Sequence, residues 1–281
     1  MSALTVYSRM IKLSHSIFAL PFALASGLLA ARQVDVTVVQ WALIVACMVT
    51  ARSSAMGFNR IVDRDHDARN PRTAGREIPS GQIGVSAAWA FTLGSAVLFV
   101  AASAALGPTT LALAPVALAV TWGYSLTKRF TWLCHAVLGV ALGISPTAVW
   151  IALTDSISAT ALLLSTAVAT WVAGFDILYS CQDADFDRAE GLSSVPSRFG
   201  LRGAMALSAA LHVVTVICLV AVPWTAPLTW PYHLGVLAIA AVLAWEHSIV
   251  RPDDLSRLDK AFFDLNGYIS LTFLGAVWLA S

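Results

Sequence analysis

The chain has 281 residues, of which 58% are hydrophobic and 12% charged, and its net charge is +1. The charged fraction is about half that of soluble domains, so an ordinary soluble protein is excluded, and the small net charge gives no indication of nucleic-acid binding. Apolar windows long enough to cross a membrane recur near residues 14–32, 37–57, 84–105, 108–125, 134–152, 158–180, 203–222, 230–249 and 261–280. The sequence therefore predicts an all-α polytopic membrane protein.

The connections between these windows differ in length and charge. Some are short and nearly uncharged, whereas the long, basic ones are 59–82, 126–133, 183–202 and 250–260. Of the 17 Lys and Arg residues, only Arg32 and Arg52 lie outside the basic loops and the N-terminal segment. Positive charge is retained on the cytoplasmic side of a membrane. We therefore expect the N-terminus and the basic loops in the cytoplasm, the C-terminus outside, and the chain in a bacterial inner membrane.

One acidic pattern, D-x-D-x-D, occurs twice. The first copy reads Asn59-x-x-x-Asp63-x-x-x-Asp67, and the second contains Asp183-x-x-x-Asp187. Residues four apart share a helix face, so each copy predicts a ladder of oxygen ligands. Two such ladders facing each other would repel unless cations lay between them. Mg²⁺ prefers oxygen ligands and fills its other positions with water and substrate phosphates, so the pattern predicts a magnesium–diphosphate site at the membrane surface.

Each acidic copy is preceded by a charge that lies inside an apolar window. Arg52 comes seven residues before Asn59, and Asp176 comes seven residues before Asp183. An ionisable residue at such a depth usually faces a cavity or a charged partner. One interpretation is a structural Arg52–Asp176 ion pair. The other is a pocket in which Arg52 meets an anionic group and Asp176 meets a hydroxyl.

Basic residues near the motifs are candidates for binding phosphate. Arg and Lys stabilise the negative charge that develops on a departing diphosphate. The candidates are Arg72, Arg76, Lys128, Arg129 and, at the mouth of the first window, Lys12. Lys128 and Arg72 are preferred over the others. The alternative for each residue is a charge that only sets the topology.

The two acidic copies belong to a weak internal repeat. Asp63 and Asp183 are 120 residues apart, and a Pro-Ser pair follows each copy. A duplicated helix–loop–helix unit would explain both features. We therefore expect one transmembrane domain over residues 1–281, with duplicated halves of about 1–130 and 131–281.

Other kinds of chemistry find little support in the sequence. The 6 histidines show neither H-x-x-x-H nor H-E-x-x-H spacing, so spacing indicates no zinc site. The 4 cysteines form no C-x-x-C pair and are interpreted as apolar packing residues. Neither a P-loop motif nor the nucleophile elbow of serine hydrolases occurs. Asn266, in the last window, is expected to bond across helices.

Together these motifs resemble those of the UbiA superfamily of intramembrane aromatic prenyltransferases, over essentially the whole chain. The matching segments are Asn59-x-x-x-Asp63-x-x-x-Asp67, Arg72…Arg76…Pro79-Ser80-Gly81, Tyr124-x-x-x-Lys128-Arg129 and Asp176-x-x-Tyr179-x-x-x-Asp183-x-x-x-Asp187. The last segment is similar to a bacterial quinone-pathway branch that includes 4-hydroxybenzoate polyprenyltransferases and enzymes that prenylate a dihydroxynaphthoate on the futalosine route to menaquinone. The Gly57-Phe58 pair before the first motif departs from the family pattern.

The resemblance implies nine transmembrane helices around a central cavity, with the motif loops as a cytoplasmic cap. It also implies an enzyme that transfers a polyprenyl group from a polyprenyl diphosphate to an aromatic carboxylate, in ubiquinone or menaquinone biosynthesis. The isoprenoid tail would lie between apolar helices that open sideways to membrane lipid. The acceptor is expected to be 4-hydroxybenzoate-like, and 1,4-dihydroxy-6-naphthoate is the alternative.

Residue roles follow from the motifs and the resemblance together. The magnesium ligands would be Asp63, Asp67, Asp183, Asp187 and Asn59. The substrate-binding residues would be Asn59, Arg72, Arg76, Tyr124, Lys128, Arg129, Tyr179 and Lys12. Asp63 and Asp183 would also be catalytic. Asp176 would orient or deprotonate the acceptor hydroxyl, and Arg52 would hold the acceptor carboxylate.

Three other classes of protein fit the sequence less well. CDP-alcohol phosphatidyltransferases resemble one contiguous acidic cluster, whereas the two clusters here are 120 residues apart. Secondary transporters favour ion sites deep in the membrane, whereas these carboxylates lie at one face. A noncatalytic scaffold leaves the four aspartates unexplained. The transporter is the main alternative from another class, and release of pyrophosphate would distinguish it from the enzyme.

Overall fold

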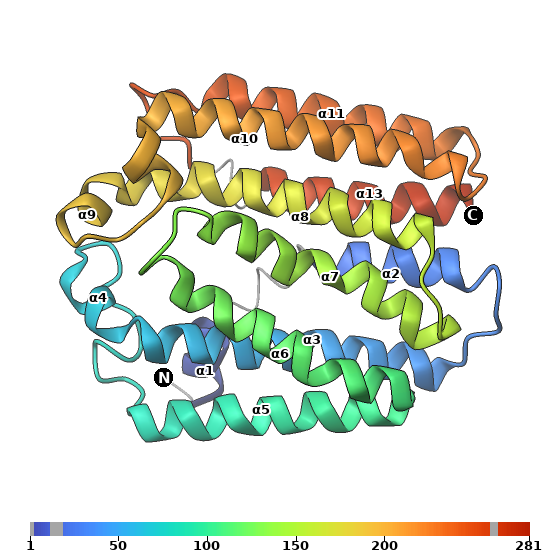
Figure 1. Cartoon of the computed structure of the whole chain (residues 1–281), viewed down its shortest axis with the longest axis horizontal. Helices are drawn as coiled ribbons and strands as arrows, with labels where there is room; N and C mark the ends of the chain where they lie inside the picture. The colour runs from blue at the N-terminus through green and yellow to red at the C-terminus, as the bar shows by residue number, and fades with distance from the viewer. Residues whose placement is uncertain (1–2, 12–18, 259–263) are drawn as a thin grey trace. The chain divides into compact units, whose positions relative to one another are not determined.

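The computed structural model describes residues 3–11, 19–258 and 264–281. The described chain is built of helices (Figure 1), and no β-strand occurs within it. One isolated bridge joins Arg251 and Asp254. The predicted all-α class is confirmed. Lys12, a predicted substrate-binding residue, lies outside the described residues.

Seven described stretches are helical and apolar enough to cross a membrane by length and composition. They are α3 (Val38–Val62), α5 (Val85–Leu106), α6 (Pro108–Thr127), α7 (Cys134–Thr154), Ala159–Ala189, Val195–Trp224 and α11 (Trp230–Ile249). The first and last predicted windows coincide with two shorter apolar helices, α2 (Ala19–Ala30) and α13 (Asn266–Ala280). Both helices adjoin residues that the structure does not describe, so their full lengths are not defined. The nine transmembrane spans and the cytoplasmic cap therefore stay predictions.

One helix begins earlier than its apolar window predicted. The window was placed at 203–222, but α10 spans Val195–Ala221. The Ser194 side chain accepts from the backbone N–H of Ser197, and the Ser197 side chain accepts in return from the Ser194 N–H, which forms a capping box. The first turns of α10 are polar, so hydropathy missed them. The helix then kinks at Gly200, whose φ of 72° favours glycine.

The helices form two compact units. One comprises Met1–Ser16 and Thr37–Leu126, and the other comprises Ile17–Val36 and Thr127–Ser281. Helix α2 therefore belongs to the second unit although it precedes the first unit's long helices. The proposed duplication into halves of about 1–130 and 131–281 stays a prediction.

In the first unit, α3 packs against α5, and α1 (Ala3–Met10) lies against α3. Ser54 donates to the carbonyl of Thr92 at 3.0 Å. A Cβ at Gly57 would collide with the Thr92 side chain, so glycine allows the close approach of the two helices. Phe58 stacks on Trp122 of α6 with ring centroids 4.8 Å apart. These contacts explain the Gly57-Phe58 pair that departs from the family pattern.

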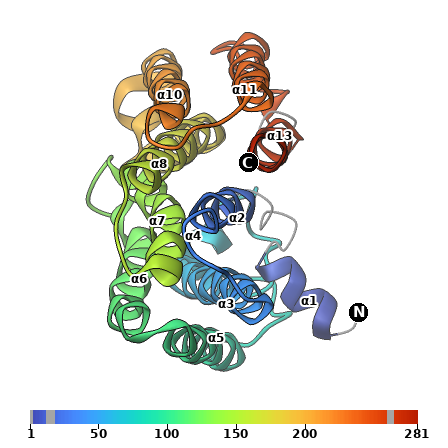
Figure 2. The same cartoon turned by 90° about the vertical axis from the view of Figure 1, so that its right-hand side faces the viewer.

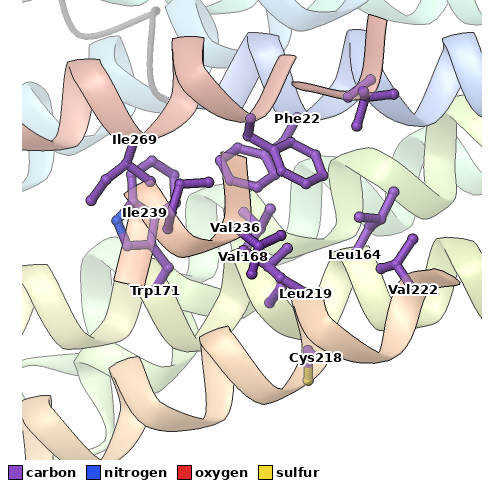
Figure 3. Packing of buried hydrophobic residues seen from close by; sticks show 14 of the residues in the cluster. Phe22, Leu164, Val168, Trp171, Cys218, Leu219, Val222, Val236, Ile239 and Ile269 are labelled. Carbon is purple, nitrogen blue, oxygen red and sulfur yellow. The ribbon is translucent and has the colours of Figure 1, made fainter. Parts of the chain in front are cut away.

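The second unit contains α2, α7, α8 (Ala159–Ser180), α10, α11 and α13. Figure 2 shows α8, α10, α11 and α13 nearly end-on, with α11 beside both α10 and α13. Apolar side chains from these helices interdigitate around Phe22 and Trp171 (Figure 3), whose rings lie 5.1 Å apart. Gly139 and Gly143 let α7 approach the backbone of α8. Small residues at helix contacts are what membrane packing requires, because lipid is as apolar as the core.

Candidate active site

The first acidic motif lies where α3 ends. Helix α3 stops at Val62, Asp63 has φ −93° and ψ 0°, and the short helix α4 (Arg64–Arg69) follows. The Asn59 amide donates to the Asp63 carboxylate at 2.8 Å. The expected uninterrupted stripe from Asn59 to Asp67 therefore has a break at its middle residue. The helical hydrogen bond from the Asp67 N–H to the Asp63 carbonyl survives at 2.8 Å.

The second motif repeats this backbone pattern within the other unit. Helix α8 ends at Ser180, a single 3₁₀ turn spans Cys181–Asp183, and the short helix α9 (Ala184–Ala189) follows. Asp183 has φ −99° and ψ 4°, close to the values at Asp63. Asp183 is buried, with 8% of its surface exposed. Both motifs thus end a long apolar helix, turn at their first motif aspartate and continue as six-residue helices.

The central carboxylates of the two motifs point away from these buried groups. The Asp65 side chain is 70% exposed and lies 3.5 Å from Arg64. The Asp185 side chain is 96% exposed and pairs with Arg188 at 2.6 Å. Neither was predicted to bind metal.

The last carboxylate of the first motif is held by a predicted phosphate-binding residue. Both oxygens of Asp67 accept from Arg76 Nη1, at 2.6 and 2.8 Å. The Thr73 hydroxyl donates to the Asp67 carbonyl at 3.1 Å. Arg72 is exposed, and its backbone N–H donates to the Asn70 side chain at 2.9 Å. The segment after α4 therefore folds back onto the motif.

The last carboxylate of the second motif is also paired with a base. Asp187 is fully buried, lies 2.7 Å from Lys128 Nζ and accepts from the Ser194 hydroxyl at 2.8 Å. Burial disfavours the charged ammonium, but the charge and hydrogen bond of Asp187, together with the charge of Asp183, outweigh this effect and raise the pKa of Lys128. Lys128 therefore keeps its charge in the folded protein. Arg129, its neighbour, is exposed.

Asp176 has a partner that the sequence analysis missed. The Asp176 Oδ2 lies 2.6 Å from Nδ1 of His135, which is buried at the start of α7. The backbone N–H of Val195 donates to His135 Nε2 at 3.3 Å. A backbone N–H can only donate, so Nε2 carries a lone pair and Nδ1–H donates to Asp176. No spacing rule relates residues 41 positions apart, although His135 follows closely after the Lys128-Arg129 loop.

Arg52 has a buried hydrogen-bond donor without an acceptor among the described residues. Its Nε is buried and has no hydrogen-bond partner among the described residues. Tyr124, a predicted substrate-binding residue on α6, is close enough to interact with it electrostatically. Tyr179, near the end of α8, is half-buried. A resting Arg52–Asp176 ion pair stays a prediction.

The family follows from a comparison with known proteins. The family model described as "UbiA prenyltransferase family" matches residues 19–270. The chain belongs to this family. It is thus an enzyme of the prenyltransferase class and an integral membrane protein.

Individual relatives agree with this assignment. A protein named 4-hydroxybenzoate octaprenyltransferase, from Klebsiella pneumoniae, is 29% identical over 83% of this chain and 81% of its own length. The apo structure of a UbiA homolog from Aeropyrum pernix K1 superposes with a TM-score of 0.85 at 33% identity and covers 94% of this chain and 97% of that chain. A UbiA homolog from Archaeoglobus fulgidus, bound to DMAPP and Mg²⁺, shares the fold, with a TM-score of 0.76 at 19% identity over 97% of this chain and 98% of that one.

Proposed function

We propose that this enzyme transfers a polyprenyl group from a polyprenyl diphosphate to a 4-hydroxybenzoate-like aromatic carboxylate, for quinone biosynthesis. The observation that carries the proposal is the pair of matched acidic motifs, each with its last carboxylate paired to a base. Membership of the prenyltransferase family and the name of the Klebsiella relative, 4-hydroxybenzoate octaprenyltransferase, support it. The basic-loop distribution supports a cytoplasmic position for both motifs.

The donor set of the motifs fits magnesium. Asp63, Asp67, Asp183, Asp187 and Asn59 offer only oxygen and amide groups, which suit a hard cation. A carboxylate oxygen has more than one lone pair, so Asp67 and Asp187 can keep their basic partners while they bind an ion. Bound there, Mg²⁺ would supply positive charge that stabilises the diphosphate as it leaves. The Archaeoglobus homolog, bound to DMAPP and Mg²⁺, supports this cofactor.

The basic residues complete the diphosphate site. Asp67 fixes the position of Arg76, and Asp187 fixes that of Lys128, so neither cation needs to be ordered when substrate arrives. Arg72 and Arg129 are exposed on the same loops and can reach a phosphate from the aqueous side. Positive charge at these positions favours cleavage of the carbon–oxygen bond to give an allylic cation and diphosphate.

Arg52 and Asp176 hold the acceptor. The unpartnered Nε of Arg52 would donate to the acceptor carboxylate, because a guanidinium binds a carboxylate as a fork. Asp176 would orient the acceptor hydroxyl and withdraw its proton as the ring carbon next to it attacks the cation. The Nδ1–H of His135 fixes the Asp176 carboxylate, so His135 acts as a positioning residue. Tyr124 and Tyr179 are further candidates for lining the acceptor.

A panel of acceptors tests the proposal directly. Membranes that contain the chain would be incubated with Mg²⁺, geranyl or longer diphosphates, and either 4-hydroxybenzoate or 1,4-dihydroxy-6-naphthoate. Product masses and released pyrophosphate would be measured. We expect a prenylated 4-hydroxybenzoate with one pyrophosphate per product, and no product in EDTA. If only the naphthoate were prenylated, the acceptor would be 1,4-dihydroxy-6-naphthoate. Uptake of substrate into vesicles without release of pyrophosphate would contradict the proposed reaction.

A further inference from the structure

Three polar side chains meet between α10 and α11, apart from the acidic motifs. They are His212 on α10 and the adjacent Glu246 and His247 on α11, and one ligand atom from each lies within 4.8 Å of the others. His212 Nδ1 is 2.9 Å from His247 Nε2 and 3.5 Å from Glu246 Oε2. Nothing in the proposed prenyl transfer uses this cluster.

The surroundings of His212 fix which of its nitrogens faces the cluster. Its Nε2 lies 3.3 Å from the backbone carbonyl of Trp171 on α8. A carbonyl only accepts, so Nε2 carries the proton, and in the neutral imidazole Nδ1 then presents a lone pair to Glu246 and His247. A Cβ at Gly174 would collide with the imidazole, so glycine makes room for the ring. Metal-ligating histidines are commonly held in this way, with the second ring nitrogen donating to a backbone carbonyl.

The Glu246 carboxylate oxygen that faces the two histidines accepts no hydrogen bond from the described residues. The residue is 1% exposed, and its buried Oε2 has no hydrogen-bond partner among the described residues. The nearest nitrogen, His212 Nδ1, presents a lone pair as well. Asn266 hydrogen-bonds the Glu246 side chain, and its own Oδ1 accepts from Trp171 Nε1 at 2.7 Å. A hydrogen bond between the two imidazoles satisfies His212 but leaves the Glu246 oxygen facing another acceptor, which is costly in a buried site.

We propose that His212, Glu246 and His247 bind a divalent transition-metal ion, for which Zn²⁺ is the best match. One ion would satisfy all three groups, since each would direct a lone pair at it. Two donors that each lie about 2.0–2.1 Å from Zn²⁺ are roughly 3.3 Å apart, close to the 2.9 and 3.5 Å separations present. Two imidazoles and a carboxylate suit zinc or iron, whereas magnesium prefers oxygen alone. A water would complete the coordination on the half-buried His247 side.

The site would fasten three helices of the second unit. It joins α10 to α11 directly, and it holds both against the stretch of α8 that contains Trp171 and Gly174. Asp176 follows Gly174 by two residues. The metal would therefore be structural, and its loss would loosen the turn that carries Asp176. The proposal rests on the cluster's own geometry and is independent of the proposed function.

Metal binding by the whole chain tests the proposal. The detergent-purified protein would be stripped with a chelator, kept in millimolar Mg²⁺ to fill the acidic motifs, and titrated with ZnCl₂ against a competing chromophoric chelator. We expect one equivalent of tightly bound zinc. Glu246→Gln, which keeps the shape, and His247→Ala, at the half-buried edge, should each weaken binding more than tenfold. His233→Ala is the matched control, because His233 is an exposed histidine on the same helix.

A stability readout separates a metal site from a hydrogen-bond cluster. Zinc should raise the thermal midpoint of the wild type and of His233→Ala, but not that of His247→Ala or Glu246→Gln. Failure of the wild type to bind one equivalent, or equal binding by all four proteins, would overturn the proposal. Because neither measurement involves prenyl transfer, these outcomes do not depend on whether the proposed function holds.

Discussion

The two acidic motifs have the same backbone conformation but differ in the charged residue that precedes each of them in its long helix. Both turn at an aspartate with φ near −95° and ψ near 0° and continue as a short helix. About three helical turns before its aspartate, the first motif has Arg52, whose buried Nε lacks an acceptor in the described chain. About two turns before its aspartate, the second motif has Asp176, which is bonded to His135. Under the proposed function, the shared part would bind metal and diphosphate, and the different part would bind the carboxylate and the hydroxyl of the acceptor.

The largest expected effect tests the shared part. Asp63→Asn and Asp183→Asn should each lower turnover by at least about 1,000-fold with any acceptor, because each removes a charge that holds the cation at the diphosphate. Product formation at saturating Mg²⁺ would be measured. Asp65→Asn and Asp185→Asn are the matched controls, since both side chains are exposed. Near-normal activity in either Asp63 or Asp183 variant would refute the metal role.

The bases paired with the outer aspartates should differ in their importance for stability. Lys128→Met leaves Asp187 fully buried without its cation, which should cost about 3–5 kcal/mol of unfolding free energy. Arg76→Met should cost less, because the Asp67 side chain keeps 9% of its surface exposed, whereas that of Asp187 has none. Lys128→Met/Asp187→Asn should regain stability without regaining activity. Denaturant unfolding of purified variants would measure the stability, and equal losses for Lys128 and Arg76 would contradict this contrast.

The pH dependence of the Lys128 contribution has a definite sign. The folded-state pKa is raised above the ordinary value, so the stabilisation is fully present below about pH 10.5 and is lost only as the pH rises through the raised folded value. The stability difference between the wild type and Lys128→Met should consequently shrink only in strong alkali. A difference that disappears between pH 7 and 9 would show that Lys128 loses its charge when folded.

Arg52, whose buried Nε has no acceptor among the described residues, should control acceptor binding. Arg52→Ala should raise the acceptor KM by about 100-fold, the value of a lost charged hydrogen bond, and leave the diphosphate KM almost unchanged. Arg52→Lys keeps the charge but not the fork, so it should fall between the two. Steady-state kinetics with each substrate varied in turn would check this. A rise confined to the diphosphate KM would move Arg52 to the other substrate.

The smallest effect belongs to His135, behind the second motif. His135→Ala should lower kcat about tenfold, because Asp176 loses the donor that orients it. His135→Asn places an amide N–H where Nδ1–H stood and should restore most of the activity. The acceptor KM and the pH profile of kcat would be measured for both. Equal impairment by Ala and Asn would mean that His135 only packs the start of α7.

Sequence reasoning predicted the parts of this protein that depend on neighbours along one helix. Apolar windows identified most of the membrane helices, because a span must satisfy its own backbone within one continuous stretch. The spacing of Asp63 and Asp67, and of Asp183 and Asp187, marked the ends of two of these helices. Hydropathy failed where polar residues begin a helix, as at Val195, because a cap rather than apolar character starts the helix there.

What the tertiary structure alone decided are contacts between helices. His135 meets Asp176 across 41 positions, Lys128 meets Asp187 across 59, and His212 meets His247 across 35. Periodicity says which residues share a face of one helix, but not which faces meet, since that depends on the rotation and close packing of whole helices. Glycines such as Gly174 make such packing possible, and their meaning appears only when the neighbouring helix is in place.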